Sequence, residues 1–97
     1  MKSFPFKIRI SPDVISQDVF LGEVLLMNVK SLIYFGLDDL GAAVWRELQN
    51  GSEANAIFER VQINTGLPEE TLAAKFEGII KGLEASGIIA LERLPQP

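Results

Sequence analysis

The side chains that most often perform chemistry in proteins are scarce in this chain. Its 97 residues contain no cysteine and no histidine. This excludes disulfide bonds and thiolate nucleophiles, and it removes the commonest general base and metal ligand. Ser16, Ser52 and Ser86 therefore have no histidine that would activate a hydroxyl as a nucleophile. We predict that the chain is not an enzyme and binds no cofactor.

Two pairs of adjacent carboxylates are the remaining candidates for a reactive or metal-binding site. Asp38 and Asp39 follow an apolar stretch, while Glu69 and Glu70 follow Pro68. Each pair stands at the expected start of a helix, where a carboxylate accepts free backbone N–H groups and meets the positive end of the helix dipole. No third ligand stands at a suitable spacing, so the pairs predict helix starts and no metal site.

Two aromatic residues, Tyr34 and Trp45, have side chains suited to stacking on a ligand. Trp45 shares an apolar helical face with Val44 and Leu48, which places it in the expected core. In an extended segment, side chains alternate between the two faces. If Phe35 points into the core, Tyr34 points away from it and is exposed.

The composition indicates one small domain, residues 1–97, with apolar surface available for a partner. Hydrophobic residues make up 47% of the chain, and its net charge is −4. That charge disfavours nucleic acid, whose binding depends on Lys and Arg neutralising phosphates. No apolar run approaches the roughly 20 residues that a membrane helix needs, and the start lacks the features of a signal peptide. We expect no membrane partner and a cytoplasmic location.

Alternating apolar residues predict strands in the first part of the chain. The alternation begins in residues 1–10, which we expect to form an extended N-terminal arm. Three further strands are predicted at residues 14–21, 24–28 and 32–36. Their short connections indicate an antiparallel meander.

A helical period of 3.6 residues replaces the alternation after residue 37. Caps and breakers predict three helices that start at Asp38, Ser52 and Pro68 and end at Gly51, Gly66 and Gly87. Residues 88–91 are expected to add a short strand, and residues 92–97 a loose tail. The predicted fold is α+β, with a three-stranded antiparallel sheet followed by three helices.

One function compatible with this order of elements is DNA binding by a winged helix-turn-helix. The third helix would then enter the major groove. That helix carries two lysines against four glutamates, at positions Lys75, Lys81, Glu69, Glu70, Glu77 and Glu84. The excess of acidic residues argues against phosphate contact.

A second function is the capture of an extended peptide at the edge of the sheet. The third strand is strongly apolar for an edge, and a peptide would add there as a further strand beside a helix. Gly78 and Gly82 cost about 1 kcal/mol each in a helix interior, but they let another segment approach closely. Burial of this strand beneath the N-terminal arm, or pairing with a second copy through edge strands, remains an alternative.

Several segments together resemble the PqqD-like family, which includes the RiPP recognition elements that bind leader peptides. The resemblance is carried by Val24–Asn28, by Tyr34–Trp45 and by the end of the third helix at Leu83, Gly87 and Ile88–Ile89. It extends from about Ser11 to Leu91. The strand-to-helix segment is fairly specific, whereas the helices alone are generic.

The resemblance implies a winged helix-turn-helix that binds the leader of a ribosomally made precursor peptide. The leader would dock as an antiparallel strand beside the third strand and against the third helix, for delivery to a modifying enzyme or leader peptidase. Lasso-peptide and pyrroloquinoline quinone pathways both remain open. The implied contact residues are Leu32, Ile33, Tyr34, Phe35 and Gly36 on the strand, and Leu72, Lys75, Phe76 and Ile79 on the helix.

The chain departs from the family pattern at two places. The turn before the third strand usually carries a Gly and then a polar residue where Leu32 and Ile33 stand, so the expected peptide edge is unusually apolar. The third helix is commonly capped by Asp, but here Leu67 precedes Pro68. Leucine cannot accept an N–H group, so we expect a cap weaker by about 1 kcal/mol.

Overall fold

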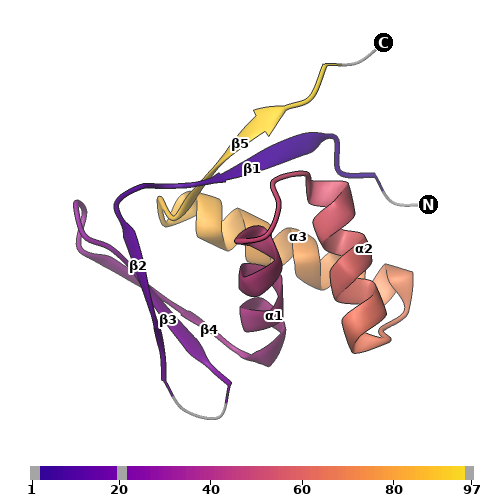
Figure 1. Cartoon of the computed structure of the whole chain (residues 1–97), viewed down its shortest axis with the longest axis horizontal. Helices are drawn as coiled ribbons and strands as arrows, with labels where there is room; N and C mark the ends of the chain where they lie inside the picture. The colour runs from indigo at the N-terminus through magenta and orange to yellow at the C-terminus, as the bar shows by residue number, and fades with distance from the viewer. Residues whose placement is uncertain (1–2, 20–21, 96–97) are drawn as a thin grey trace.

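Five strands and three helices make up the computed structural model, which describes residues 3–19 and 22–95. The elements are β1 Phe6–Ile10, β2 Val14–Asp18, β3 Val24–Asn28, β4 Ile33–Leu37, α1 Asp39–Leu48, α2 Ala54–Thr65, α3 Glu69–Ala85 and β5 Ile89–Arg93. Strands β2, β3 and β4 form an antiparallel sheet in that order, and the helices lie to one side of it (Figure 1). The predicted α+β fold is confirmed.

Alternation along β3 and β4 separates a helix-facing side of the sheet from an outer side. On β3, Val24 and Leu26 are buried, and on β4 Leu37 is 4% exposed. Tyr34 points the other way and is 62% exposed, as predicted. The first strand of this sheet ends at Asp18, earlier than predicted, and residues 20 and 21 lie outside the described residues.

The N-terminal arm forms a strand, β1, that pairs with β5 in a second, two-stranded sheet. The arm is anchored by Phe4, whose backbone N–H donates to the side-chain oxygen of Asn55 at 2.7 Å. The Phe4 ring packs against Phe58 and Phe76, with centroid distances of 5.0 Å in both cases. Because the arm lies here, it does not cover β4, and that alternative is wrong within the described residues.

The two ends of the chain are more ordered than the sequence predicted. Glu92 and Arg93 belong to β5, so the segment 92–97 is not a loose tail throughout. In β5, Glu92 also pairs with Arg9 of β1 at 3.0 Å. The two strands together place a short sheet across the helical layer (Figure 1).

Several predicted helix ends are confirmed. Asp38 caps α1, and its Oδ1 accepts the backbone N–H of Gly41 at 2.9 Å. Gly66 and Gly87 follow α2 and α3 with φ of 69° and 74°, the left-handed region that glycine enters without steric cost. Helix α3 starts after Pro68 with no side-chain cap, as expected from the missing aspartate.

The predicted junction at Gly51 and Ser52 is wrong in detail. Helix α1 ends at Leu48, and α2 follows Glu53, which supplies no side-chain cap. The Ser52 carbonyl instead accepts the backbone N–H of Ile8 at 2.7 Å, so this loop holds β1. The position of this junction between α1 and α2 is therefore set by contact with a distant strand. Local capping preferences do not contain that information.

The turn between β3 and β4 depends on Asn28, which is only 8% exposed. Its Oδ1 accepts the backbone N–H groups of Lys30 and Ser31 at 2.9 and 3.1 Å. Its Nδ2 donates to the Gly87 carbonyl at 3.0 Å. One side chain thus closes the turn and ties it to the end of α3, so that β4 starts beside that helix.

The same turn contains Leu32 at φ 61°, the single positive φ among the described residues other than glycine. This conformation crowds the Cβ against the backbone and costs roughly 1–2 kcal/mol for an L-residue. The Leu32 side chain is 69% exposed, so packing recovers little of that cost. It stands where the resemblance described above implies a glycine, the residue that adopts this φ without steric cost.

We predict that Leu32→Gly raises the free energy of unfolding by about 1 kcal/mol, because glycine adopts this φ without strain. Thermal unfolding followed by circular dichroism should show a melting temperature higher by roughly 4–8 °C for a domain of this size. Ser31→Gly in the same turn is the control and should give no such rise. An unchanged or lower melting temperature for Leu32→Gly would contradict the account.

A second prediction concerns Asn28→Asp, which keeps the acceptor Oδ1 but loses the donor to Gly87. Two acceptor oxygens would then face each other, and we expect a loss of roughly 1–3 kcal/mol in urea unfolding. Asn55→Asp is the matched control, since it adds the same charge and keeps the acceptor that binds Phe4. Equal stability losses in both variants would show that charge, and not the lost donor, is responsible.

Candidate functional site

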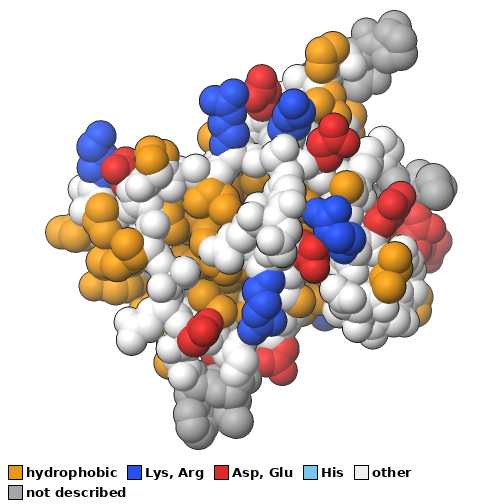
Figure 2. Space-filling view, viewed as in Figure 1, with side chains coloured by type: hydrophobic (Ala, Val, Ile, Leu, Met, Phe, Trp, Pro, Cys, Tyr) orange, Lys and Arg blue, Asp and Glu red, His pale blue; other side chains and the backbone are white. Residues whose placement is uncertain are grey.

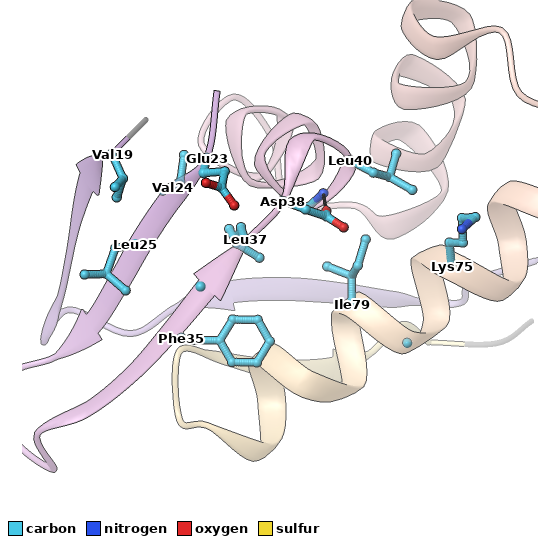
Figure 3. Close-up of a pocket in the computed structure, with 13 residues that line it drawn as sticks. Val19, Glu23, Val24, Leu25, Phe35, Leu37, Asp38, Leu40, Lys75 and Ile79 are labelled. Carbon is cyan, nitrogen blue, oxygen red and sulfur yellow. Dashed lines mark hydrogen bonds between the residues drawn. The ribbon is translucent and has the colours of Figure 1, made fainter. Parts of the chain in front are cut away.

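A groove of about 680 Å³ lies between the meander, the start of α1 and the outer surface of α3. Residues of the strand region and residues of the helices line it together. They are Val19, Glu23, Val24, Leu25, Phe35, Gly36, Leu37, Asp38, Leu40, Gly41, Lys75, Gly78 and Ile79. Figure 3 shows Phe35, Leu37 and Ile79 directed into the space between β4 and α3. The groove therefore runs beside the edge of β4 that was predicted to receive a peptide.

Phe35 forms one end of the groove by resting directly on α3. A Cβ added to Gly82 would lie 2.9 Å from the Phe35 ring, which is closer than a methyl group can approach. The absence of a side chain at Gly82 thus lets β4 approach the helix here. Of the two helix glycines for which a close approach was predicted, Gly82 therefore shows one.

Gly78 lies one helical turn earlier and has the opposite surroundings. No atom outside its own stretch of helix lies within 4 Å of the position that a Cβ would take, and the residue lines the groove. The space beside Gly82 is therefore filled by the Phe35 ring, whereas the space beside Gly78, between Ile79 and the strand, is open. The same residue type closes one end of the groove and opens the other.

Four helix residues were predicted to face a peptide, and the structure divides them. Lys75 and Ile79 line the groove, one helical turn apart. Leu72 and Phe76 are fully buried, and Phe76 packs against Phe4 and Phe58. They do not line the groove. The apolar stripe of α3 is wide, so that one part of it faces the core and another part faces the groove.

On the strand side, β4 offers mainly its backbone and the Phe35 ring. Among the described strands β4 pairs only with β3, so its other edge carries unpaired N–H and C=O groups. The Tyr34 side chain lies on the outer side of the sheet, away from Phe35. Leu32 belongs to the turn before the strand, and Ile33 is 43% exposed at its start.

Sequence reasoning missed several residues of the groove. Leu37 and Leu40 were not among the predicted contact residues, yet both line the groove. Gly78 was noticed for its helix position but was not assigned to the site. Its cost to helix stability was the available signal, since a glycine inside a helix needs a compensating reason.

Charges in the groove are unevenly distributed. Lys75 stands on the helix side, while Glu23 and Asp38 stand on the strand side. The Asp38 carboxylate is already engaged in capping α1. No cluster of three potential metal ligands occurs in residues 3–19 and 22–95, and no helix in that part of the chain is long and apolar enough to cross a membrane.

The contrast between the two helix glycines gives a direct stability test. We predict that Gly78→Ala raises the free energy of unfolding by up to about 1 kcal/mol, because alanine favours the helix and meets no neighbour. Gly82→Ala gains the same propensity but must displace Phe35, so we expect a net loss of roughly 1–2 kcal/mol. Urea unfolding measures both, and equal effects would contradict the proposed packing.

Comparisons with known proteins agree with this geometry. The family model described as Coenzyme PQQ synthesis protein D (PqqD) matches residues 23–89, which is more than half of the chain. A solved structure described as TbiB1 in complex with the TbiA(beta) leader peptide has the same fold, with a TM-score of 0.74 and 23% sequence identity. The similarity covers 84% of this chain and 93% of that chain. No curated protein matches the sequence. The chain belongs to the PqqD family.

Proposed function

We propose that this single domain binds the leader segment of a ribosomally made precursor peptide in the groove between β4 and α3. The observation that carries the proposal is the unpaired edge of β4 beside an apolar groove. Binding requires no catalytic group, and the protein acts as an adaptor without chemistry of its own. Its place is the cytoplasm, where ribosomes supply the precursor.

Backbone pairing would supply much of the affinity. An exposed sheet edge is a template for another strand, and peptide recognition by strand addition uses this geometry. The leader would add as a fourth strand, antiparallel to β4, in the sheet β2-β3-β4. The contributing backbone runs from Ile33 to Leu37, while Leu32 sets the turn from which the strand starts.

Side-chain selection would take place in the groove. Alternate residues of an added strand point toward the helix, where Phe35, Leu40 and Ile79 offer apolar contacts. Gly78 leaves room for a bulky apolar side chain from the leader. A groove volume of about 680 Å³ lies within the range of about 300–1,000 Å³ typical of ligand sites.

Lys75 adds a charge preference on the helix side of the groove. It is exposed and forms no ion pair within 4 Å among the described residues. We infer that it attracts an acidic residue of the leader, with the modest strength of an exposed pair. The DNA-binding alternative is not supported, since α3 carries more carboxylates than lysines and the protein is acidic.

The comparisons support this proposal at two levels. The family is named for the synthesis of a coenzyme, pyrroloquinoline quinone, and the solved structure of similar fold holds a leader peptide. By the same logic the bound leader would be delivered to a modifying enzyme or leader peptidase, because holding a substrate near an enzyme raises its effective concentration. Both the lasso-peptide and the quinone pathway are compatible with this role.

Titration with a fluorescently labelled leader, taken from the precursor encoded beside the gene, tests the proposal. We expect binding in the micromolar range or tighter, and a loss of at least tenfold for Gly78→Leu, which adds a bulky side chain in the groove at a position where a Cβ meets no atom within 4 Å. A tenfold loss corresponds to about 1.4 kcal/mol. Circular dichroism should confirm that this variant remains folded.

Charge reversal at two lysines of α3 provides a matched comparison. Lys75→Glu should weaken leader binding several-fold, and the effect should shrink at high salt. Lys81→Glu makes the same charge change outside the groove and should alter binding less than twofold. Equal effects of the two variants, or salt-sensitive binding to duplex DNA without leader binding, would overturn the proposed function.

A further inference from the structure

The outer side of the three-stranded sheet carries apolar side chains that leader binding does not explain, and it meets the groove at Leu25 and Gly36. Two rows of side chains cross it in register, Ile15–Met27–Tyr34 and Gln17–Leu25–Gly36. Neither row contains a charged residue. Ile15 and Tyr34 are 56% and 62% exposed, and no described element covers them.

Exposed hydrophobic side chains are concentrated on this small sheet and its turn. Of the seven large ones that are exposed in residues 3–19 and 22–95, six lie here, and Ile63 on α2 is the exception. Five of them are Ile15, Val19, Val29, Leu32 and Tyr34, and the sixth, Ile33, lies on the helix-facing side of β4. Figure 2 shows hydrophobic side chains gathered over the end of the sheet near the β3–β4 turn. Contiguous apolar surface of this kind marks an interaction site in a protein of this size.

We propose that this outer face pairs with the same face of a second copy of the chain. The two copies would be related by a two-fold axis that lies between the sheets and runs across the strands. Such an axis places each strand of one copy antiparallel to the same strand of the other copy. It also places the row Ile15–Met27–Tyr34 of one copy opposite the row Gln17–Leu25–Gly36 of the other. An isologous interface of this type requires a face that complements itself.

The shape of the face meets this requirement. The two-fold axis sets Tyr34 of one copy opposite Gly36 of the other, since these residues occupy the same column in adjacent rows. Tyr34 protrudes, whereas no atom lies within 4 Å of the position of a Cβ on Gly36. The ring of each copy therefore fits over the open space on the other. Ile15 would likewise lie over Gln17.

The charges at the two ends of the face also complement each other in such a dimer. Lys30 stands at the β3–β4 turn, and Glu23 stands at the opposite end, just before β3. The antiparallel arrangement brings Lys30 of each copy near Glu23 of the other. A parallel arrangement would instead place Lys30 beside Lys30 and Glu23 beside Glu23, so this pair of charges favours the antiparallel one.

The expected dimer is weak. Three strands about 4.8 Å apart and five residues long give a face smaller than the roughly 800 Å² per partner of standard interfaces. We therefore expect a dissociation constant on the order of 100 μM. Sheets packed face to face keep their strands within about 30° of alignment, which permits the rows to meet.

Sedimentation velocity of the full chain between 5 μM and 1 mM tests the proposal. The expected result is a shift from 10.7 kDa toward twice that mass as the concentration rises. Ile15→Glu should keep the protein monomeric, while Ile63→Glu, at the exposed hydrophobic residue outside the sheet, should leave the shift unchanged. A monomer at every concentration would overturn the proposal. The same result is expected if the face binds only a different protein, so that alternative is also tested.

A charge swap tests the arrangement of the dimer. Lys30→Glu and Glu23→Lys should each weaken dimerisation about tenfold, since each creates two repulsive pairs, and the double variant should restore it. Failure of the double variant to recover would overturn the antiparallel pairing.

The leader peptide separates this dimer from one formed through the β4 edges. A face-to-face dimer leaves the unpaired edge of β4 and the helix side of the groove free, so saturating leader peptide should not dissociate it, and Ile15→Glu should bind leader as the wild type does. Dissociation of the dimer by leader would overturn face pairing in favour of edge pairing. Leader binding and self-association are read separately, so one can fail without the other.

Discussion

The contact between the Phe35 ring and Gly82 fixes the distance between β4 and α3, and the groove depends on that distance. A methyl group at position 82 would hold the strand and the helix apart. Because the ring lies flush with the helix at this point, the groove is closed at one end. One turn away, Gly78 meets no neighbour, and the space widens. Two glycines on one helix thus form a site with a closed end and an open region.

Several tertiary connections hold the strand and the helix in this arrangement. Asn28 bonds the β3–β4 turn to the Gly87 carbonyl at the end of α3, just beyond the Phe35 contact. On the far side of α3, Phe76 packs against Phe4 of the N-terminal arm, and the arm is itself held by β5 and by Ser52. The arm therefore braces the helix from behind and leaves the β4 edge free.

The unpaired edge and the outer face of the sheet have different physical characters. The edge presents backbone groups whose partners must come from another chain, and the groove beside it adds apolar contacts with one lysine. The outer face presents side chains in rows without charge. The two surfaces meet at Leu25 and Gly36, and a strand added to β4 would leave Ile15, Met27 and Tyr34 of the outer face accessible.

The sequence by itself determined the order of elements, the cap at Asp38, the buried Trp45 and the exposed Tyr34. These follow from local periodicity and capping, which depend on neighbours in the chain. The tertiary structure decided where the arm lies, why Ser52 does not cap α2, and which residues of α3 face the groove. Leu72 and Ile79 occupy one apolar stripe in the sequence, and only packing against Phe4, Phe58 and β4 divides that stripe into core and site. Contacts between distant segments set those outcomes, and no local pattern encodes them.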